Sequence, residues 1–167
     1  DFSRATFEGT AEFEDARFDG DVWFRQATFA DEAHFSEVTF AEDATFESAR
    51  FEAPANFRGT EFRGGARTLE DDVRFVDAPF AADVDFSQAE IRYSNLADAT
   101  FEGDAHFQET WFNADADFVG ATFEGQADFD EVRFVEDTDF SEVTFEGQAV
   151  FRGAEFRGHA NRLEDNA

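Results

Sequence analysis

The sequence contains no cysteine and no long run of apolar residues. The absence of cysteine excludes a disulfide framework and a metal site with thiolate ligands. A membrane-spanning helix needs roughly 20 consecutive apolar residues, and no segment of this chain approaches that length. No signal-like segment opens the chain. We therefore expect a soluble body with no membrane contact in this segment.

Lysine is absent as well, so all 13 basic residues are arginines, against 40 aspartates and glutamates. The net charge of -27 and the pI near 4.1 fit either a halophilic source or selection for a strongly anionic surface. Both alternatives predict repulsion of nucleic acids and anionic membranes. We expect no direct binding of nucleic acid, and a protein partner with a basic surface.

Phenylalanines recur along the chain in alternating steps of five and six residues, and all 26 fall in this register. An amphipathic helix needs apolar spacing near 3.6 residues, which such steps do not keep on one face. The residue two positions before each phenylalanine is usually alanine or valine, and the residue between them is usually polar, as in Ala5-Thr6-Phe7. This alternation predicts short extended strands with one buried face.

Glycine marks the ends of the predicted strands. All but one of the 11 glycines lie two residues after a central apolar residue, where glycine tolerates the positive φ that a tight corner can require. In the six-residue steps the extra residue is most often aspartate, which is also common in turns. The sequence thus predicts a chain that turns after every strand, with two kinds of corner in alternation.

A strand of two or three residues cannot bury a phenylalanine alone and must stack on the next coil, which predicts a solenoid. The units Ala5 to Gly9, Ala16 to Gly20 and Ala121 to Gly125 resemble the repeats of the pentapeptide repeat protein family. The resemblance implies an all-β fold, a right-handed quadrilateral β-helix solenoid that is continuous over residues 1–167. The alternating steps imply about 7 coils of about 22 residues, with a core of phenylalanine and alanine or valine.

The ladder is irregular in two places. The next phenylalanine after Phe62 comes 13 residues later, and Phe86, Ile91, Leu96 and Phe101 follow one another in steps of five. Residues 57–71 also resemble residues 151–165 at an offset of 94, which predicts an internal duplication of about 2–73 and 96–167 joined by 74–95. We expect the interruption after Phe62 to recur after Phe156. The segment from Gly64 to Asp72 is the best candidate for a contact loop, because interruptions of a regular scaffold often carry recognition.

The candidate protein contacts are arginines near the interruption and two tryptophans at outward positions, namely Arg63, Arg67, Arg74, Trp23 and Trp111. Arginine can bind a carboxylate or phosphate, and an exposed tryptophan can anchor an interface. Two alternatives remain open: the arginines could neutralise neighbouring acids, and the tryptophans could be exposed by chance. Because 88 residues separate the tryptophans, we do not expect them to form one site.

No residues in the sequence predict catalysis. His34, His106 and His159 have no ligand-like spacing, and the acidic corners lack the pattern of a calcium loop. No nucleophile motif or phosphate-binding glycine loop is present. We expect no enzymatic activity, no cofactor and no specific metal site.

Two functions remain in competition. The first is a structural or protein-interaction module, in which a rigid acidic rod presents loops or a flank to a protein partner. The second is implied by the resemblance: some family members are quinolone-resistance proteins thought to mimic DNA and occupy DNA gyrase, and a net charge of -27 is compatible with that role. The ladder runs to both ends without a capping helix, so we also expect a piece of a larger protein or end-to-end association.

Overall fold

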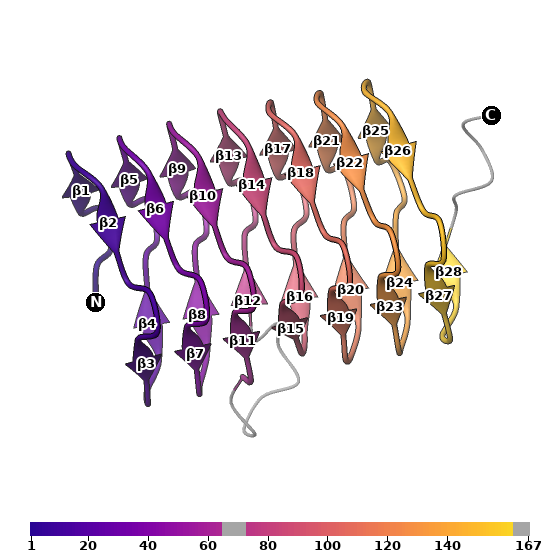
Figure 1. The fold of residues 1–167 in the computed structure, drawn as a ribbon, viewed down its shortest axis with the longest axis horizontal. Coiled ribbons are helices and arrows are strands. Elements are labelled where there is room, and N and C mark those ends of the chain that lie inside the picture. The colour runs from indigo at the N-terminus through magenta and orange to yellow at the C-terminus, as the bar shows by residue number, and fades with distance from the viewer. Residues whose placement is uncertain (65–72, 162–167) are drawn as a thin grey trace.

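The computed structural model describes residues 1–64 and 73–161, which form 28 parallel two-residue β-strands (Figure 1). The strands are short because each one contributes only one inward and one outward residue before the chain turns. Within the described ranges, no helix is long and apolar enough to cross a membrane.

The strands form four parallel sheets of seven strands each. Sheet A contains β1 (Thr6–Phe7), β5 (Thr28–Phe29), β9 (Arg50–Phe51), β13 (Pro79–Phe80), β17 (Thr100–Phe101), β21 (Thr122–Phe123) and β25 (Thr144–Phe145). Sheet B contains β2 (Ala11–Glu12), β6 (Ala33–His34), β10 (Ala55–Asn56), β14 (Val84–Asp85), β18 (Ala105–His106), β22 (Ala127–Asp128) and β26 (Ala149–Val150).

The other two sheets are built in the same way. Sheet C contains β3 (Arg17–Phe18), β7 (Thr39–Phe40), β11 (Glu61–Phe62), β15 (Glu90–Ile91), β19 (Trp111–Phe112), β23 (Arg133–Phe134) and β27 (Glu155–Phe156). Sheet D contains β4 (Val22–Trp23), β8 (Ala44–Thr45), β12 (Val73–Arg74), β16 (Ser94–Asn95), β20 (Ala116–Asp117), β24 (Thr138–Asp139) and β28 (Ala160–Asn161).

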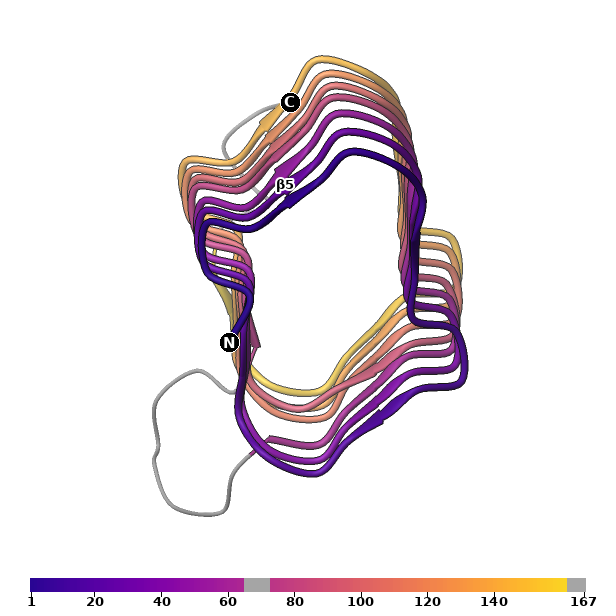
Figure 2. The same ribbon diagram turned by 90° about the vertical axis from the view of Figure 1, so that its left-hand side faces the viewer.

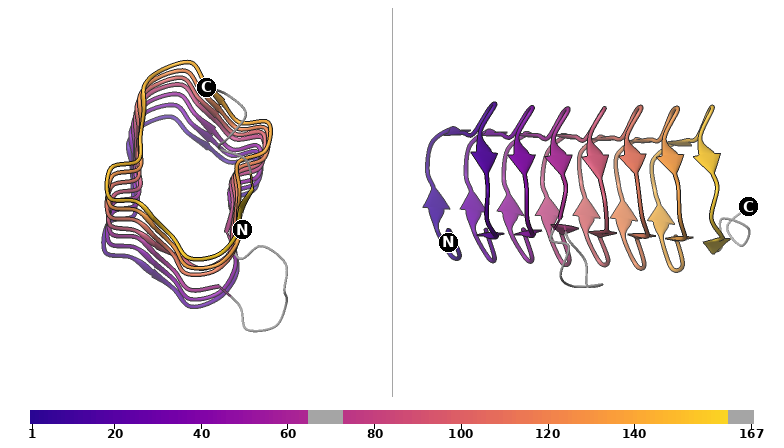
Figure 3. Two further views of the ribbon diagram at one scale, coloured as in Figure 1. Left: turned by 90° about the vertical axis from the view of Figure 1, so that its right-hand side faces the viewer. Right: turned by 90° about the horizontal axis from the view of Figure 1, so that it is seen from below.

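Each coil passes through sheets A, B, C and D in turn, so the cross-section is four-sided (Figures 2 and 3). Seen from the N-terminal end in Figure 2, the chain runs clockwise and away from the viewer, which makes the solenoid right-handed. Each sheet holds one strand per coil, giving seven coils and six full turns between its first and last strands. The register of Thr6 with Thr28 and of Phe7 with Phe29 confirms the expected coil of 22 residues.

The core consists of four columns of phenylalanine rings, one behind each sheet, with alanine and valine beside them. Rings in successive coils stack nearly parallel, as for Phe107 and Phe129, whose centroids are 4.8 Å apart at 1°. Rings in neighbouring columns meet edge to face, as for Phe35 and Phe46 at 90°. Both arrangements are favourable for aromatic pairs. Ile91 replaces the ring in the sheet C column and Leu96 in the sheet D column, both in the same coil.

Tight corners join sheet B to sheet C and sheet D to sheet A. In one of them the N–H of Ala27 donates a hydrogen bond to the Phe24 carbonyl oxygen, and Gln26 has a φ of 56°, as in a type II turn. Glycine occupies this positive-φ position at Gly59, Gly120 and Gly153. At the other tight corners the position is filled by Arg4, Asp15, Gln26, Glu37, Ser48, Asp77, Gln88, Asp98, Glu109, Glu131 and Glu142.

Wide corners join sheet A to sheet B and sheet C to sheet D, and most of their glycines have an ordinary φ. Here glycine is required by close stacking: a Cβ on Gly125 would collide with the backbone of Gly103, and one on Gly147 with the backbone of Gly125. The expectation that positive φ explains the corner glycines is therefore confirmed at tight corners and wrong at most wide ones. Gly9, in the first coil, has no atom within 4 Å of such a Cβ.

Aspartates at the wide corners cap the backbone of the next coil. The Oδ1 of Asp115 accepts a hydrogen bond from the N–H of Asp137 at 3.2 Å, and the Oδ1 of Asp137 accepts one from the N–H of His159 at 2.8 Å. On the opposite wide corner, Asp83 and Asp104 cap the N–H groups of the following coils in the same way. These acids stabilise the stacking of coils, in addition to being compatible with a turn.

Both irregularities of the ladder lie at the same wide corner, between sheets C and D. Ten residues separate Phe62 from Val73, two separate Ile91 from Ser94, and three separate Phe112 from Ala116 in the next coil. The expected recurrence after Phe156 is wrong, since three residues lead directly into β28, which pairs with β24. Most of the segment from Gly64 to Asp72, with Leu69 and Arg67, lies outside the described residues, and the internal duplication remains a prediction.

Candidate protein-interaction site

The two tryptophans lie on different sheets. Trp23 is on β4 of sheet D in the first coil, and Trp111 is on β19 of sheet C in the fifth, with exposed fractions of 37% and 41%. They do not form one site, as expected. Arg74 is half-buried on sheet D, two coils beyond Trp23 in the same outward column. Arg63 is exposed directly after β11 on sheet C, and Arg67 lies outside the described residues.

The outward side of sheet C carries a concentration of arginine that we call the arginine face. It is formed by the outward residue of each sheet C strand and the residue that follows the strand. Its arginines are Arg17, Arg63, Arg92, Arg133 and Arg157, and its acids are Asp19, Glu61, Glu90 and Glu155. On a chain with a net charge of -27, this face has nearly balanced charge. It is therefore the side of the rod where an acidic or aromatic partner group meets the least repulsion.

Trp111 lies near the middle of this face and is held by its neighbours. Parallel pairing places Glu90 on one side of it and Arg133 on the other. The Arg133 guanidinium carbon is 4.6 Å from the centroid of the Trp111 ring. A cation–π contact at an exposed site contributes about 0.5–1 kcal/mol. The stacking also limits the rotamers of both side chains, which lowers the entropy lost when a partner binds them.

Two open hollows lie on this face, and Trp111 lines one of them. One, of about 260 Å³, is lined by Glu61, Phe62, Arg63, Glu90, Arg92 and Asn113. The other, of about 430 Å³, is lined by Gln88, Glu90, Glu109, Trp111, Glu131 and Arg133. Both are lined by Glu90 of β15, so they adjoin at this residue. Their linings are largely charged, which suits the side chains of a protein partner better than a drug-sized apolar molecule.

Several arginines of this face pair with an acid two residues away. Arg63 lies 2.6 Å from Glu61, and Arg157 lies 2.9 Å from Glu155. These two arginines therefore make the local ion pairs that one of the two alternatives from the sequence describes. Exposed pairs of this kind contribute up to about 1 kcal/mol and exchange partners readily. Arg92 instead lies over the Tyr93 ring at 5.6 Å.

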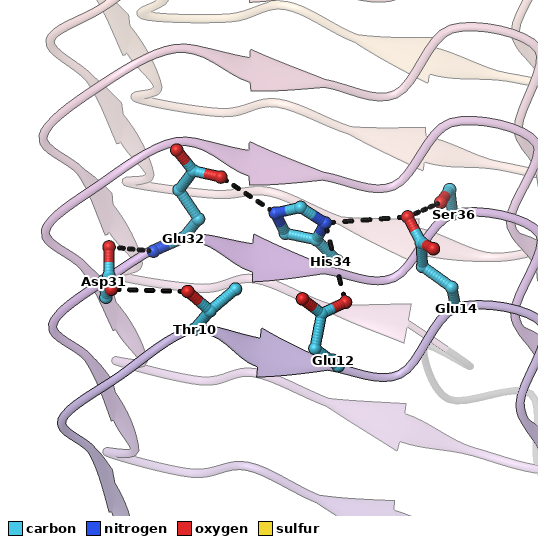
Figure 4. A network of polar contacts seen from close by, with 7 residues as sticks. All are labelled: Thr10, Glu12, Glu14, Asp31, Glu32, His34 and Ser36. Carbon is cyan, nitrogen blue, oxygen red and sulfur yellow. Dashed lines mark hydrogen bonds and ion pairs between the residues drawn. The ribbon is translucent and has the colours of Figure 1, made fainter.

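A second cluster lies on the outward side of sheet B, around His34 (Figure 4). Its Nδ1 is 3.5 Å from Glu14 Oε1 and 3.8 Å from Glu12 Oε2, while its Nε2 is 3.0 Å from Glu32 Oε2. The hydrogen bond with Glu32 is the main cause of a raised pKa for His34. Partial burial opposes it, and the charge of Glu12 and the hydrogen bond with Glu14 add to it. Ser36 Oγ donates a hydrogen bond to Glu14 Oε1 at 3.1 Å.

Neither grouping is evident from local sequence patterns, because the members of each are one coil apart. Glu12 and His34 differ by 22 positions, as do Trp111 and Arg133, and each pair consists of partners in neighbouring strands. Ligand spacings within a single loop or helix do not reveal such neighbours. The signal that could have found them was the coil length itself, since adding 22 to an outward position gives the side chain beside it.

Solved structures of a known protein resemble this chain at low sequence identity. The structure of full-length QnrB1, a plasmid-mediated fluoroquinolone resistance protein, is 16% identical with a TM-score of 0.42, and the match covers 92% of this chain and 75% of that one. A trypsin-treated variant of QnrB1 is 14% identical with a TM-score of 0.41, covering 90% and 72%. A search of curated proteins found no match.

The family comparison covers nearly the whole chain. The family model for pentapeptide repeats, built on nine copies of the repeat, matches residues 1–38, 24–67, 68–111, 86–133 and 118–161. These ranges follow the same phenylalanine ladder that forms the stacked core. The four-sided coil and the match together confirm the expectation from the sequence, and the chain belongs to the pentapeptide repeat family.

Proposed function

We propose that this protein is a non-catalytic interaction module that binds a protein partner through the arginine face, with Trp111 as the central anchor. The observation that carries the proposal is the stacking of Arg133 on Trp111, an exposed pair that lines one hollow of the arginine face. Tryptophan and arginine are the residue types most enriched among energetically dominant interface residues. The partner has a basic surface around its contact site, because the acidic flanks of the rod attract such a surface and steer its approach.

The proposal is tested by placing a photo-cross-linking amino acid at Trp111 and, as a matched control, at Trp23. Both positions are outward and similarly exposed, but they lie on different sheets. Cross-linking from position 111 and not from position 23 is expected. With the purified cross-linked partner, Trp111→Ala and Arg133→Ala should each weaken binding by at least about tenfold, while Trp23→Ala leaves it unchanged. Equal cross-linking, or equal affinity of the three variants, would contradict this docking surface.

The second candidate function is a DNA mimic that inhibits or protects DNA gyrase or topoisomerase. It is supported by a row of exposed glutamates at one position of the wide corner after sheet A, Glu102, Glu124 and Glu146, in successive coils. Strands in a sheet are about 4.8 Å apart, so this row presents regularly spaced negative charges, as a nucleic-acid backbone does.

A gyrase supercoiling assay separates the two functions. If the mimic is correct, the protein inhibits supercoiling, and the triple substitution of Glu102, Glu124 and Glu146 by glutamine weakens inhibition far more than Trp111→Ala does. Inhibition should also fall as salt is raised, because screening weakens contacts between charged surfaces. Absence of inhibition at moderate salt would leave the interaction module as the function to pursue.

A further inference from the structure

Three potential metal ligands meet at the junction of the first two coils. Glu12 on β2 and His34 on β6 are direct partners in the parallel pairing. Glu14 lies two residues after Glu12 in the first coil. Figure 4 shows the two carboxylates on the same side of the imidazole ring, both facing its Nδ1. One ligand atom from each residue can be chosen so that all three lie within 4.8 Å of one another. The group combines two acids with an imidazole, the commonest metal ligand in proteins.

The distances suit a tetrahedral ion after a small adjustment. Oxygen and nitrogen ligands lie about 2.0–2.1 Å from Zn²⁺, so two ligand atoms in tetrahedral geometry are about 3.3 Å apart. The Nδ1 atom of His34 is 3.5 Å from Glu14 Oε1 and 3.8 Å from Glu12 Oε2. Each of the two exposed glutamates therefore needs only a small side-chain rotation to bring its oxygen to this distance from Nδ1.

The surrounding contacts already resemble the outer shell of a metal site. Glu32 Oε2 is 3.0 Å from His34 Nε2, on the side of the ring that faces away from Glu12 and Glu14. When Nε2–H donates to this carboxylate, Nδ1 carries the lone pair and directs it at the other two glutamates. A carboxylate on the second nitrogen of a ligating histidine fixes the tautomer and raises the basicity of the ligand. Ser36 Oγ orients Glu14 from outside.

We propose that Glu12, Glu14 and His34 bind one divalent transition-metal ion of the Zn²⁺ class, with water at the remaining coordination positions. The imidazole favours Zn²⁺, Cu²⁺ or Ni²⁺ over Ca²⁺ and Mg²⁺, which prefer all-oxygen sites. The ion links the first coil to the second, because its ligands come from adjacent strands. This inference is independent of the proposed protein-interaction function, since the site lies on sheet B and the arginine face on sheet C.

The experiment is a calorimetric titration of the metal-free protein with ZnCl₂ at high salt and with excess Mg²⁺, which suppress nonspecific cation binding to the acidic surface. His34→Ala is compared with His106→Ala as a matched control. His106 has the same outward position in the same sheet, between Asp85 and Asp128, and its Nδ1 faces the side chain of Gln108. One saturable site is expected, and His34→Ala should weaken it by at least about tenfold whereas His106→Ala leaves it unchanged.

Two further measurements complete the test. Glu14→Gln, which keeps the shape of the side chain, should also weaken zinc binding, and circular dichroism should show that each variant remains folded. In a heteronuclear NMR spectrum, Zn²⁺ should shift the ring nitrogens of His34 and not those of His106. Any of three results would overturn the proposal. Zinc binding could be unaffected by His34→Ala and Glu14→Gln, it could be lost equally in His106→Ala, or it could disappear in excess Mg²⁺.

Discussion

The carboxylate of Asp137 accepts a hydrogen bond from the backbone N–H of His159, one coil further along the chain, at 2.8 Å. The same oxygen lies 3.2 Å from Nδ1 of the His159 ring. The backbone hydrogen bond is the main cause, and the imidazole the second, of a lowered pKa for the Asp137 carboxyl. A side chain that sequence patterns associate only with a turn therefore connects two coils.

Stability should depend on the ionisation of Asp137. Because its pKa is lower in the folded chain than in the unfolded chain, the group stabilises the fold at pH values above its unfolded pKa. That contribution is lost as the pH falls through the folded value. In urea denaturation, Asp137→Ala should therefore be less stable than the wild type at neutral pH, and the difference should shrink in acid. Glu136→Gln controls for the loss of one charge, and a difference independent of pH would contradict the assignment.

Gly125→Ala should destabilise the protein by about 1–3 kcal/mol, because the new methyl group collides with backbone atoms of Gly103 that cannot rotate away. The control is Gly9→Ala, which occupies the same kind of corner in the first coil and has open space around its Cβ position. It should change the free energy of unfolding little. Chemical denaturation measures both, and equal effects would show that close stacking is not the reason for glycine here.

The same substitution should have opposite effects at two buried threonines. Thr60 Oγ1 donates a hydrogen bond to the Phe35 carbonyl oxygen at 2.7 Å, so Thr60→Val should lower stability by about 1 kcal/mol. Thr138 Oγ1 is buried without a hydrogen-bond partner among the described residues. Thr138→Val should therefore be neutral or stabilising by up to about 1 kcal/mol. Thermal unfolding of the two variants provides the comparison, and a loss of stability in both would refute this difference.

Removing a central ring should be more damaging than removing a terminal one. Phe107 is fully buried and stacked on both sides, 5.2 Å from Phe86 and 4.8 Å from Phe129. Phe107→Ala should lower stability by about 3–5 kcal/mol, the usual loss for a buried aromatic ring. Phe2 is only partly buried and stacks on Phe24 alone among the rings of its column. Phe2→Ala should therefore lower the unfolding free energy less, and similar losses would argue against a stacked core.

The fold could be predicted from the sequence because the residue pattern that determines it repeats within short stretches of the chain. Each residue of the ladder contacts the coil before and the coil after, so the spacing of phenylalanines determines both the coil length and the side that faces inward. Local patterns were less informative about corners. Arginine is not a residue type that indicates the positive φ of 61° found at Arg4, and the collision that requires glycine at Gly125 involves a residue 22 positions earlier.

The candidate sites were predicted only in part, for the same reason. The outward position of Trp111 follows from alternation along one strand and was confirmed. The stacking of Arg133 on it depends on the next coil, as does the meeting of His34 with Glu12 and Glu14. A prediction of such contacts needs the sequence offset between paired residues, which departs from 22 wherever a corner gains or loses residues, as between Val73 and its partners Ala44 and Ser94.

The corner between sheets C and D shows that the register survives such changes when they occur outside the strands. Ten residues separate β11 from β12 and two separate β15 from β16, yet β12 and β16 pair with each other in the same alignment as their neighbours. Each doubling of a flexible loop adds only about 0.6 kcal/mol of closure entropy. This corner can therefore gain or lose residues during evolution while the strands on either side keep their pairing, and an engineered peptide could be grafted there on the same principle.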